Sequence, residues 1–98
     1  MMAPLRWTFP KSYRHLKNLA ERAGVHEFEY RARITWDKTD PVAKVTISCD
    51  GAEWSRVLLV ADLEVGGEDT TAFLRETVDA MATVDQATYK GWMHHREV

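Results

Sequence analysis

The chain has 98 residues, of which 45% are hydrophobic and 29% charged, and its 13 Lys and Arg against 15 Asp and Glu give a formal net charge of −2. This is the composition of an ordinary globular protein, and the length suffices for one two-layer domain but not for two, so we expect residues 1–98 to form a single domain. The longest strongly apolar run, residues 57–61, is too short to span a membrane. The N-terminus has no apolar stretch typical of a signal peptide, and the single Cys49 suits a reducing compartment, so we expect a cytoplasmic protein.

The first element along the chain is predicted to be an arm or short edge strand in residues 1–9, where Trp7 and Phe9 alternate with polar residues. Pro10 suits the first turn of a helix, and the stretch after it has apolar residues at helical spacing. The apolar positions are Tyr13, Leu16, Leu19, Ala20 and Ala23. Gly24 followed by the apolar Val25 predicts that this helix ends in a Schellman motif.

Two strands are predicted next, because apolar and polar residues alternate. In residues 27–36 the inward positions are Phe28, Tyr30, Ala32, Ile34 and Trp36. After turn residues 37–41, the second strand has Ala43, Val45, Ile47 and Cys49 inward and Lys44, Thr46 and Ser48 outward. One buried and one solvated face is typical of an antiparallel sheet.

The adjacent residues Asp50 and Gly51 are a strong signal for a tight hairpin turn. A two-residue turn would place Ile47 opposite Trp54, Val45 opposite Arg56 and Ala43 opposite Leu58. A three-residue loop with a bulge would instead place Val45 opposite Val57 and Ala43 opposite Leu59. The third strand is predicted over residues 53–63; its apolar residues point to both sides, which favours a central or doubly covered strand and leaves both registers open.

A second helix is predicted after Gly66 and Gly67, beginning with the acidic residues Glu68 and Asp69. Its buried stripe is predicted to comprise Phe73, Leu74, Val78, Met81 and Val84. Residues 85–98 form either a continuation of this helix or a separate short tail helix. The predicted fold class is therefore α+β, in the order α-β-β-β-α: a three-stranded antiparallel meander with helices packed on one face.

No catalytic motif is present, and we predict neither catalytic residues, a metal, nor a cofactor. Cys49 lies on the inward face of a strand, as expected of a small core residue. The adjacent His94 and His95 diverge on a helix and face opposite sides of a strand, so they lack the spacing of a zinc site. The sequence therefore favours a binding protein over an enzyme.

Charge is distributed unevenly along the chain. Residues 1–34 hold seven Lys and Arg and three acids, a net charge of +4, whereas residues 35–98 hold six and twelve, a net charge of −6. Opposed charge of this kind can steer a charged partner. Acidic residues are densest in residues 62–85, within and around the second predicted helix.

The function predicted from this pattern is protein binding, to a partner with a basic patch, through an acidic helix face and exposed aromatic residues. The predicted contact residues are Asp62, Glu64, Glu68, Asp69, Glu76 and Asp79, with Tyr89, Trp92 and Met93 in the tail. A small protein with an acidic helix is also typical of phage and mobile-element inhibitors of host nucleic-acid-binding machinery, such as anti-CRISPR proteins. Both a monomer and a dimer are compatible with the sequence.

The alternative function is nucleic-acid binding through the basic N-terminal helix and first strand. The residues concerned are Lys11, Arg14, Lys17, Arg22, Arg31 and Arg33. The α-β-β-β-α order resembles that of the double-stranded RNA-binding domain. That family has a Lys-rich cluster at the start of its second helix, where this chain has Glu68 and Asp69, which would repel phosphates. This difference counts against membership and against the alternative.

Overall fold

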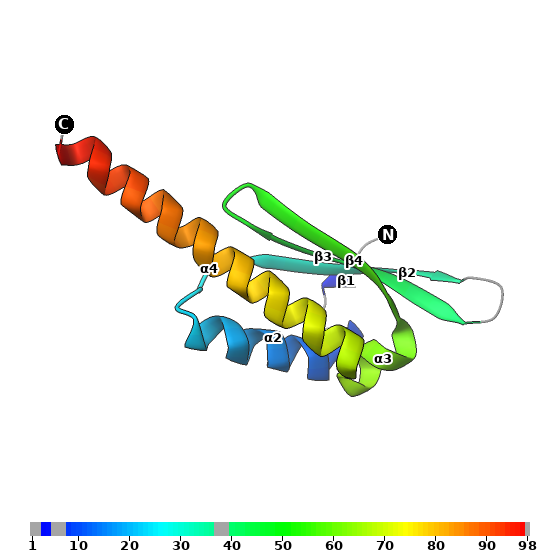
Figure 1. Cartoon of the computed structure of the whole chain (residues 1–98). Coiled ribbons are helices and arrows are strands. Elements are labelled where there is room, and N and C mark those ends of the chain that lie inside the picture. Colours follow the sequence, from blue (N-terminus) through cyan, green and yellow to red (C-terminus); the bar gives the residue numbers. More distant parts are fainter. Residues whose placement is uncertain (1–2, 5–7, 37–39, 98) are drawn as a thin grey trace.

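The fold consists of one four-stranded antiparallel sheet with helices on one of its faces (Figure 1). The structure is a computed structural model that describes residues 3–4, 8–36 and 40–97, with side chains described for residues 8–35 and 40–84. The elements are β1 (Ala3–Pro4), α2 (Pro10–Arg22), β2 (Glu29–Trp36), β3 (Pro41–Cys49), β4 (Ala52–Leu59), α3 (Val60–Val65) and α4 (Glu68–Glu97). The predicted α+β class and its α-β-β-β-α order are confirmed, with the short β1 and α3 added.

The sheet has the order β1-β2-β3-β4, so β1 and β4 are its two edges. Part of the predicted arm forms β1, which pairs with β2 through Ala3 opposite Ala32. Phe9, also assigned to the arm, is instead the N-cap residue of α2, and its side chain is buried.

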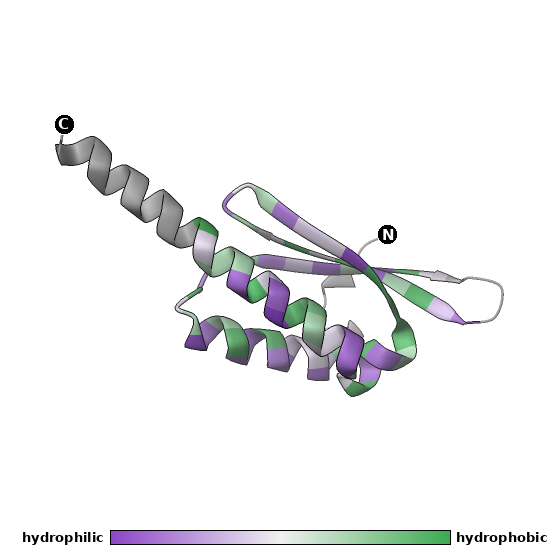
Figure 2. Ribbon diagram, in the orientation of Figure 1, coloured by the Kyte–Doolittle hydropathy of each residue, from purple (hydrophilic) through white to green (hydrophobic). Residues whose placement is uncertain are grey.

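The predicted alternation on β2 and β3 is confirmed at most positions. It is wrong at two: Ile34, predicted to point inward, is 42% exposed, and Thr46, predicted to point outward, is buried. The side chain of Trp36 lies outside the described residues. Ala32 pairs with Val45 on the helix-covered face, and both side chains are buried. Arg33 pairs with Lys44 on the opposite face, which we call the open face, and both are exposed. Figure 2 shows the resulting alternation of hydrophobic and hydrophilic residues along the strands.

The hairpin between β3 and β4 adopts the first of the two predicted registers. Ile47 lies opposite Trp54, and Cys49 lies opposite Ala52, which leaves only Asp50 and Gly51 in the turn. Their φ angles are 50° and 83°. A type I′ turn requires positive φ at both central residues, and an Asp-Gly pair tolerates this conformation best.

The expectation for residues 53–63 is wrong in two respects. The strand ends at Leu59 and the chain turns into α3, in which Leu63 is fully buried. The apolar run thus spans a change from strand to helix, where the inward spacing changes from two residues to three or four. Moreover, β4 is an edge strand rather than a central one, and Val57 and Leu59 are 60% and 48% exposed.

The end of α2 follows the predicted Schellman motif. The N–H of Val25 donates to the carbonyl of Ala20 at 2.9 Å, and the N–H of Gly24 donates to that of Glu21 at 3.1 Å. Gly24 has φ of 76°, the left-handed conformation that this motif needs. This turn ends α2 and lets the chain change direction before β2 begins at Glu29.

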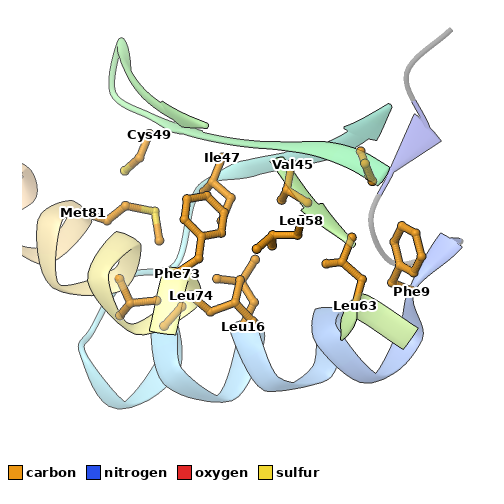
Figure 3. Close-up of a cluster of buried hydrophobic side chains, with 14 of the residues drawn as sticks. Phe9, Leu16, Val45, Ile47, Cys49, Leu58, Leu63, Phe73, Leu74 and Met81 are labelled. Carbon is orange, nitrogen blue, oxygen red and sulfur yellow. The ribbon is translucent and has the colours of Figure 1, made fainter. Parts of the chain in front are cut away.

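The core lies between the sheet and the helices (Figure 3), and the predicted buried residues of α4 are confirmed up to Met81, with Val84 half-buried. It comprises Phe9, Leu16, Ala20, Val25, Ala32, Ala43, Val45, Ile47, Cys49, Leu58, Leu63, Phe73, Leu74, Val78 and Met81. Residues 85–97 continue α4 without a break, so the first of the two alternatives for the C-terminal segment is correct. Within α4 the buried Thr77 hydroxyl donates to the carbonyl of Phe73 at 2.7 Å, which satisfies its hydrogen-bonding need.

Candidate functional site

Five of the predicted acidic contact residues are exposed on α3 and α4, and we call them together the acidic helix surface. Its members are Glu64, Glu68, Asp69, Glu76 and Asp79. The four on α4 fall within about 100° of arc around the helix axis, given 100° per residue. The other side of α4 packs into the core, so Glu68, Asp69 and Asp79 are exposed on a helix held firmly by packing, whereas Glu76 lies close enough to the sheet to contact Arg56 of β4.

Asp62, the sixth predicted acidic residue, has a structural role instead. Its Oδ2 accepts hydrogen bonds from the Thr70 N–H at 2.7 Å and the Thr70 hydroxyl at 2.6 Å. Thr70 lies in the first turn of α4 and is fully buried. Asp62 therefore caps α4 from α3, satisfying a backbone N–H and placing negative charge at the positive end of the helix.

Gly67 allows this cap to form. A Cβ atom at Gly67 would lie only 1.9 Å from Asp62 Oδ1, so no other residue fits beside the carboxylate without displacing it. The Gly67 N–H also donates to the Asp62 carbonyl at 2.9 Å. The two glycines before α4 thus have different roles. Gly66, with φ of 65°, ends α3, and Gly67 makes room for the cap.

Only one member of the acidic helix surface is neutralised by a cation among the described side chains. The Arg56 guanidinium lies 2.6 Å from Glu76 Oε2 and 5.1 Å from the centre of the Phe73 ring, so it bridges β4 and α4. Glu64, Glu68, Asp69 and Asp79 have no ion pair within the same described set. Their charge faces solvent and is available to a partner.

The predicted aromatic part of the contact surface belongs to the C-terminal part of α4. The side chains of Tyr89, Trp92 and Met93 lie outside the described residues, although their backbone belongs to α4.

The six predicted basic residues do not form one surface. Lys11, Arg14, Lys17 and Arg22 are exposed on the solvent side of α2. Arg31 and Arg33 are exposed on the open face, with the whole sheet between them and α2 (Figure 1). The proposed nucleic-acid surface is therefore divided between the two sides of the domain.

On the open face, Lys44 is a third exposed cation close to Arg31 and Arg33, and it was not among the predicted binding residues. Lys44 lies directly opposite Arg33, and the neighbouring Thr46 hydroxyl is 3.1 Å from that of Ser55. Glu29 provides one nearby acid, at 3.9 Å from Arg31. The outward position of Lys44 was predictable from alternation, but its partner depends on the register across residues 37–40, which local sequence does not define.

Nothing in the described part of the chain points to catalysis or metal binding. Cys49 is buried in the core, and its Sγ donates to the carbonyl of Glu27 at 3.4 Å. Within the described ranges, no three His, Cys, Asp or Glu side chains are grouped as metal ligands require. None of the described helices combines the length and apolar character needed to cross a bilayer.

The chain matches no known protein family, no curated protein and no solved structure. The geometry of the described residues is thus the basis for assigning a function.

Proposed function

We propose that the protein is a non-enzymatic binding module whose acidic helix surface contacts a basic patch on a partner protein. The observation that supports this proposal is the set of exposed carboxylates on α4, of which Glu68, Asp69 and Asp79 have no ion-pair partner among the described residues. They lie on a helix whose opposite side is packed into the core, so little conformational entropy of the backbone is lost on binding. Such a surface steers a basic partner and accelerates its association.

The basic helix α2, beside α4, would help to orient the partner protein. α2 packs beside α4 on the same face of the sheet and exposes Lys11, Arg14, Lys17 and Arg22. The helical layer thus presents a basic and an acidic helix side by side. A partner with one basic patch is attracted to α4 and repelled by α2, and this contrast defines how it docks.

A nucleic-acid-binding protein is the partner class that best suits this surface. Carboxylates held on a rigid helix can occupy positions that a protein has built for phosphates, and the partner's Lys and Arg then form charge-assisted hydrogen bonds with them. The protein would block nucleic-acid binding by that partner, which is how an anti-CRISPR-like inhibitor encoded by a phage or mobile element would act.

Charge reversal of the free carboxylates tests the proposal. A tagged chain carrying Glu68→Lys, Asp69→Lys and Asp79→Lys is compared with the wild type in affinity capture from the source cells, with elution by salt. The matched control carries Glu21→Lys, Glu27→Lys and Asp40→Lys, which change the net charge equally at exposed positions outside α3, α4 and β4. We expect the α4 variant to lose a basic partner that the wild type and the control both retain.

Two results would contradict the proposal. One is capture of the same partner by the α4 variant and the wild type in equal amounts. The other concerns the partner class: if the captured protein binds nucleic acid, the wild-type chain must compete with that nucleic acid, and simultaneous binding of both would exclude the inhibitory role.

A further inference from the structure

The two edges of the sheet are protected very differently. The described part of β1 is two residues long, and one of them is Pro4, which has no N–H to offer a further strand. β4 has eight residues and pairs with β3 in an unbroken register. It contains no proline, no lysine and no bulge, which are the usual means of blocking an edge.

The tight hairpin determines which backbone groups of β4 point outward. In a two-residue hairpin the residues flanking the turn, Cys49 and Ala52, form a hydrogen-bonded pair, and such pairs alternate along the ladder. Ala52, Trp54 and Arg56 therefore direct their N–H and C=O groups toward β3. Those of the intervening residues point away from the sheet, and these residues are Glu53, Ser55 and Val57. Within the described chain no further strand pairs with this edge.

The side chains along this edge are unusual for a surface that only faces water. Val57 and Leu59 are among the most exposed large apolar residues described, at 60% and 48%. Both lie on the open face beside the free backbone groups. An uncovered edge with exposed apolar side chains is a site for pairing with another strand.

We propose that β4 pairs antiparallel with β4 of a second copy of this chain, about a two-fold axis at Ser55. In this register Ser55 faces Ser55 of the second copy, and Glu53 faces Val57 in each direction. All outward N–H and C=O groups of these three residues are then paired. The result is a continuous sheet of two four-stranded halves, with the helices of both copies on the same side.

Charge complementarity favours a second copy over an unrelated strand. On the open face one row across the sheet is acidic, with Glu29, Ser48 and Glu53, and another is basic, with Arg33, Lys44 and Val57 at its end. Pairing about Ser55 places the acidic row of each copy in line with the basic row of the other. At about 4.8 Å per strand, Glu53 lies two strands, about 10 Å, from Lys44 of the second copy, within reach of both side chains across Val57.

The two neighbouring symmetric registers toward the C-terminal end of β4 are less favourable. An axis at Arg56 would place two arginines directly opposite each other at the centre of the interface. An axis at Val57 would leave Glu53 outside the pairing and would use Leu59, which is the N-cap residue of α3. The axis at Ser55 avoids both problems.

Disulfide cross-linking tests the register. In a Cys49→Ala background, Ser55→Cys places two thiols across the axis with Cα atoms about 5.5 Å apart, a distance that a disulfide spans. We expect a covalent dimer under mild oxidation. Val57→Cys alone should not cross-link to itself, because its two copies are offset by four residues, about 13 Å, along the strands. Mixing Val57→Cys with Glu53→Cys chains should yield the hetero-dimer.

Sedimentation of the intact chain tests the association itself. We expect the wild type to change from monomer to dimer with rising concentration up to about 100 µM, as a small interface with micromolar affinity does. Val57→Glu, which faces Glu53 of the second copy, should abolish the dimer. Val65→Glu is the matched control, since Val65 is 67% exposed at the end of α3, and it should dimerise like the wild type.

Three outcomes would overturn the proposal. If the wild type stays monomeric over the whole concentration range, β4 does not pair with a second copy, and its edge either binds a strand of another protein or faces water. Equal dimerisation of the two Val→Glu variants, both shown to be folded by circular dichroism, places the interface elsewhere. Faster cross-linking of Val57→Cys than of Ser55→Cys assigns a different axis.

Discussion

The two faces of the sheet differ in what holds them together. On the helix-covered face, Val45 and Ile47 are fully buried against α2 and α4, and almost every neighbouring side chain is apolar. On the open face the same two central strands expose charges, with Lys44 opposite Arg33, and Thr46 is buried beside them. Stability therefore resides on one face, whereas the other is free to vary in charge and to recognise partners.

Polar contacts on the covered side also differ from those on the open side, because they join separate helices. The buried Ser12 hydroxyl of α2 donates to the carbonyl of Leu63 in α3 at 2.6 Å, and Asp62 of α3 accepts from Thr70 of α4. Hydrogen bonds removed from water leave unsatisfied groups when they are broken, whereas exposed ones are replaced by water. The same substitution on the two sides should thus have unequal effects.

Adjacent leucines on β4 should show the largest contrast. Leu58 is 4% exposed on the covered face and Leu59 is 48% exposed on the open face. We expect Leu58→Ala to lower the free energy of unfolding by about 3 kcal/mol, because it leaves a cavity, and Leu59→Ala by about 0.5 kcal/mol. Urea denaturation of both variants in a Val57→Glu chain, which excludes dimerisation, measures the difference. Equal losses would mean that the open face is covered in solution.

Neighbouring acids on α3 should show the next largest contrast. Asp62→Ala removes the acceptor of the Thr70 N–H and hydroxyl, both in the buried start of α4, so we expect a loss of about 2 kcal/mol. Glu64→Ala, on the exposed side of the same helix, should change stability by less than about 0.5 kcal/mol. Thermal unfolding followed by circular dichroism compares the two. A small effect at Asp62 would show that the cap is dispensable.

Two serines extend the comparison to neutral groups. Ser12→Ala removes a buried hydroxyl and leaves the Leu63 carbonyl without this donor, at a cost of about 1.5 kcal/mol. Ser55→Ala removes an exposed hydroxyl that contacts Thr46 on the open face, and water replaces it, so the loss should stay below about 0.5 kcal/mol. Urea denaturation of both variants in the Val57→Glu background gives the values. The prediction fails if Ser55→Ala is the more destabilising.

The sequence predicted the covered face better than the open face, for a physical reason. Alternation and helical spacing report burial, so Ala32 of β2, the inward residues of β3 and the stripe from Phe73 to Met81 were predictable, whereas Ile34 of β2 is exposed although it was expected to point inward. Whether β4 is central or at an edge depends on what packs beside it, and an apolar residue such as Val57 looks the same in both cases. The cap formed by Asp62 was missed because it joins two helices across a turn, and the residue was counted as surface charge.

The smallest expected effect concerns the cations on the open face. Arg33 and Lys44 are exposed, directly opposite each other, and neither has an ion pair among the described residues. Like charges in this arrangement repel, so Lys44→Glu in the otherwise wild-type chain should raise the free energy of unfolding by about 0.5 kcal/mol, measured at a concentration low enough to keep the chain monomeric. Because the pair is exposed, the gain should shrink as salt is added. Urea denaturation at low and high ionic strength measures this gain in the free energy of unfolding.

Lys44→Gln is the control that separates lost repulsion from added attraction. It removes the repulsion from Arg33 without adding an attraction to it, and should give about half the gain. A loss of stability in both variants would show that the Lys44 ammonium is held by a contact on the open face that outweighs its repulsion from Arg33.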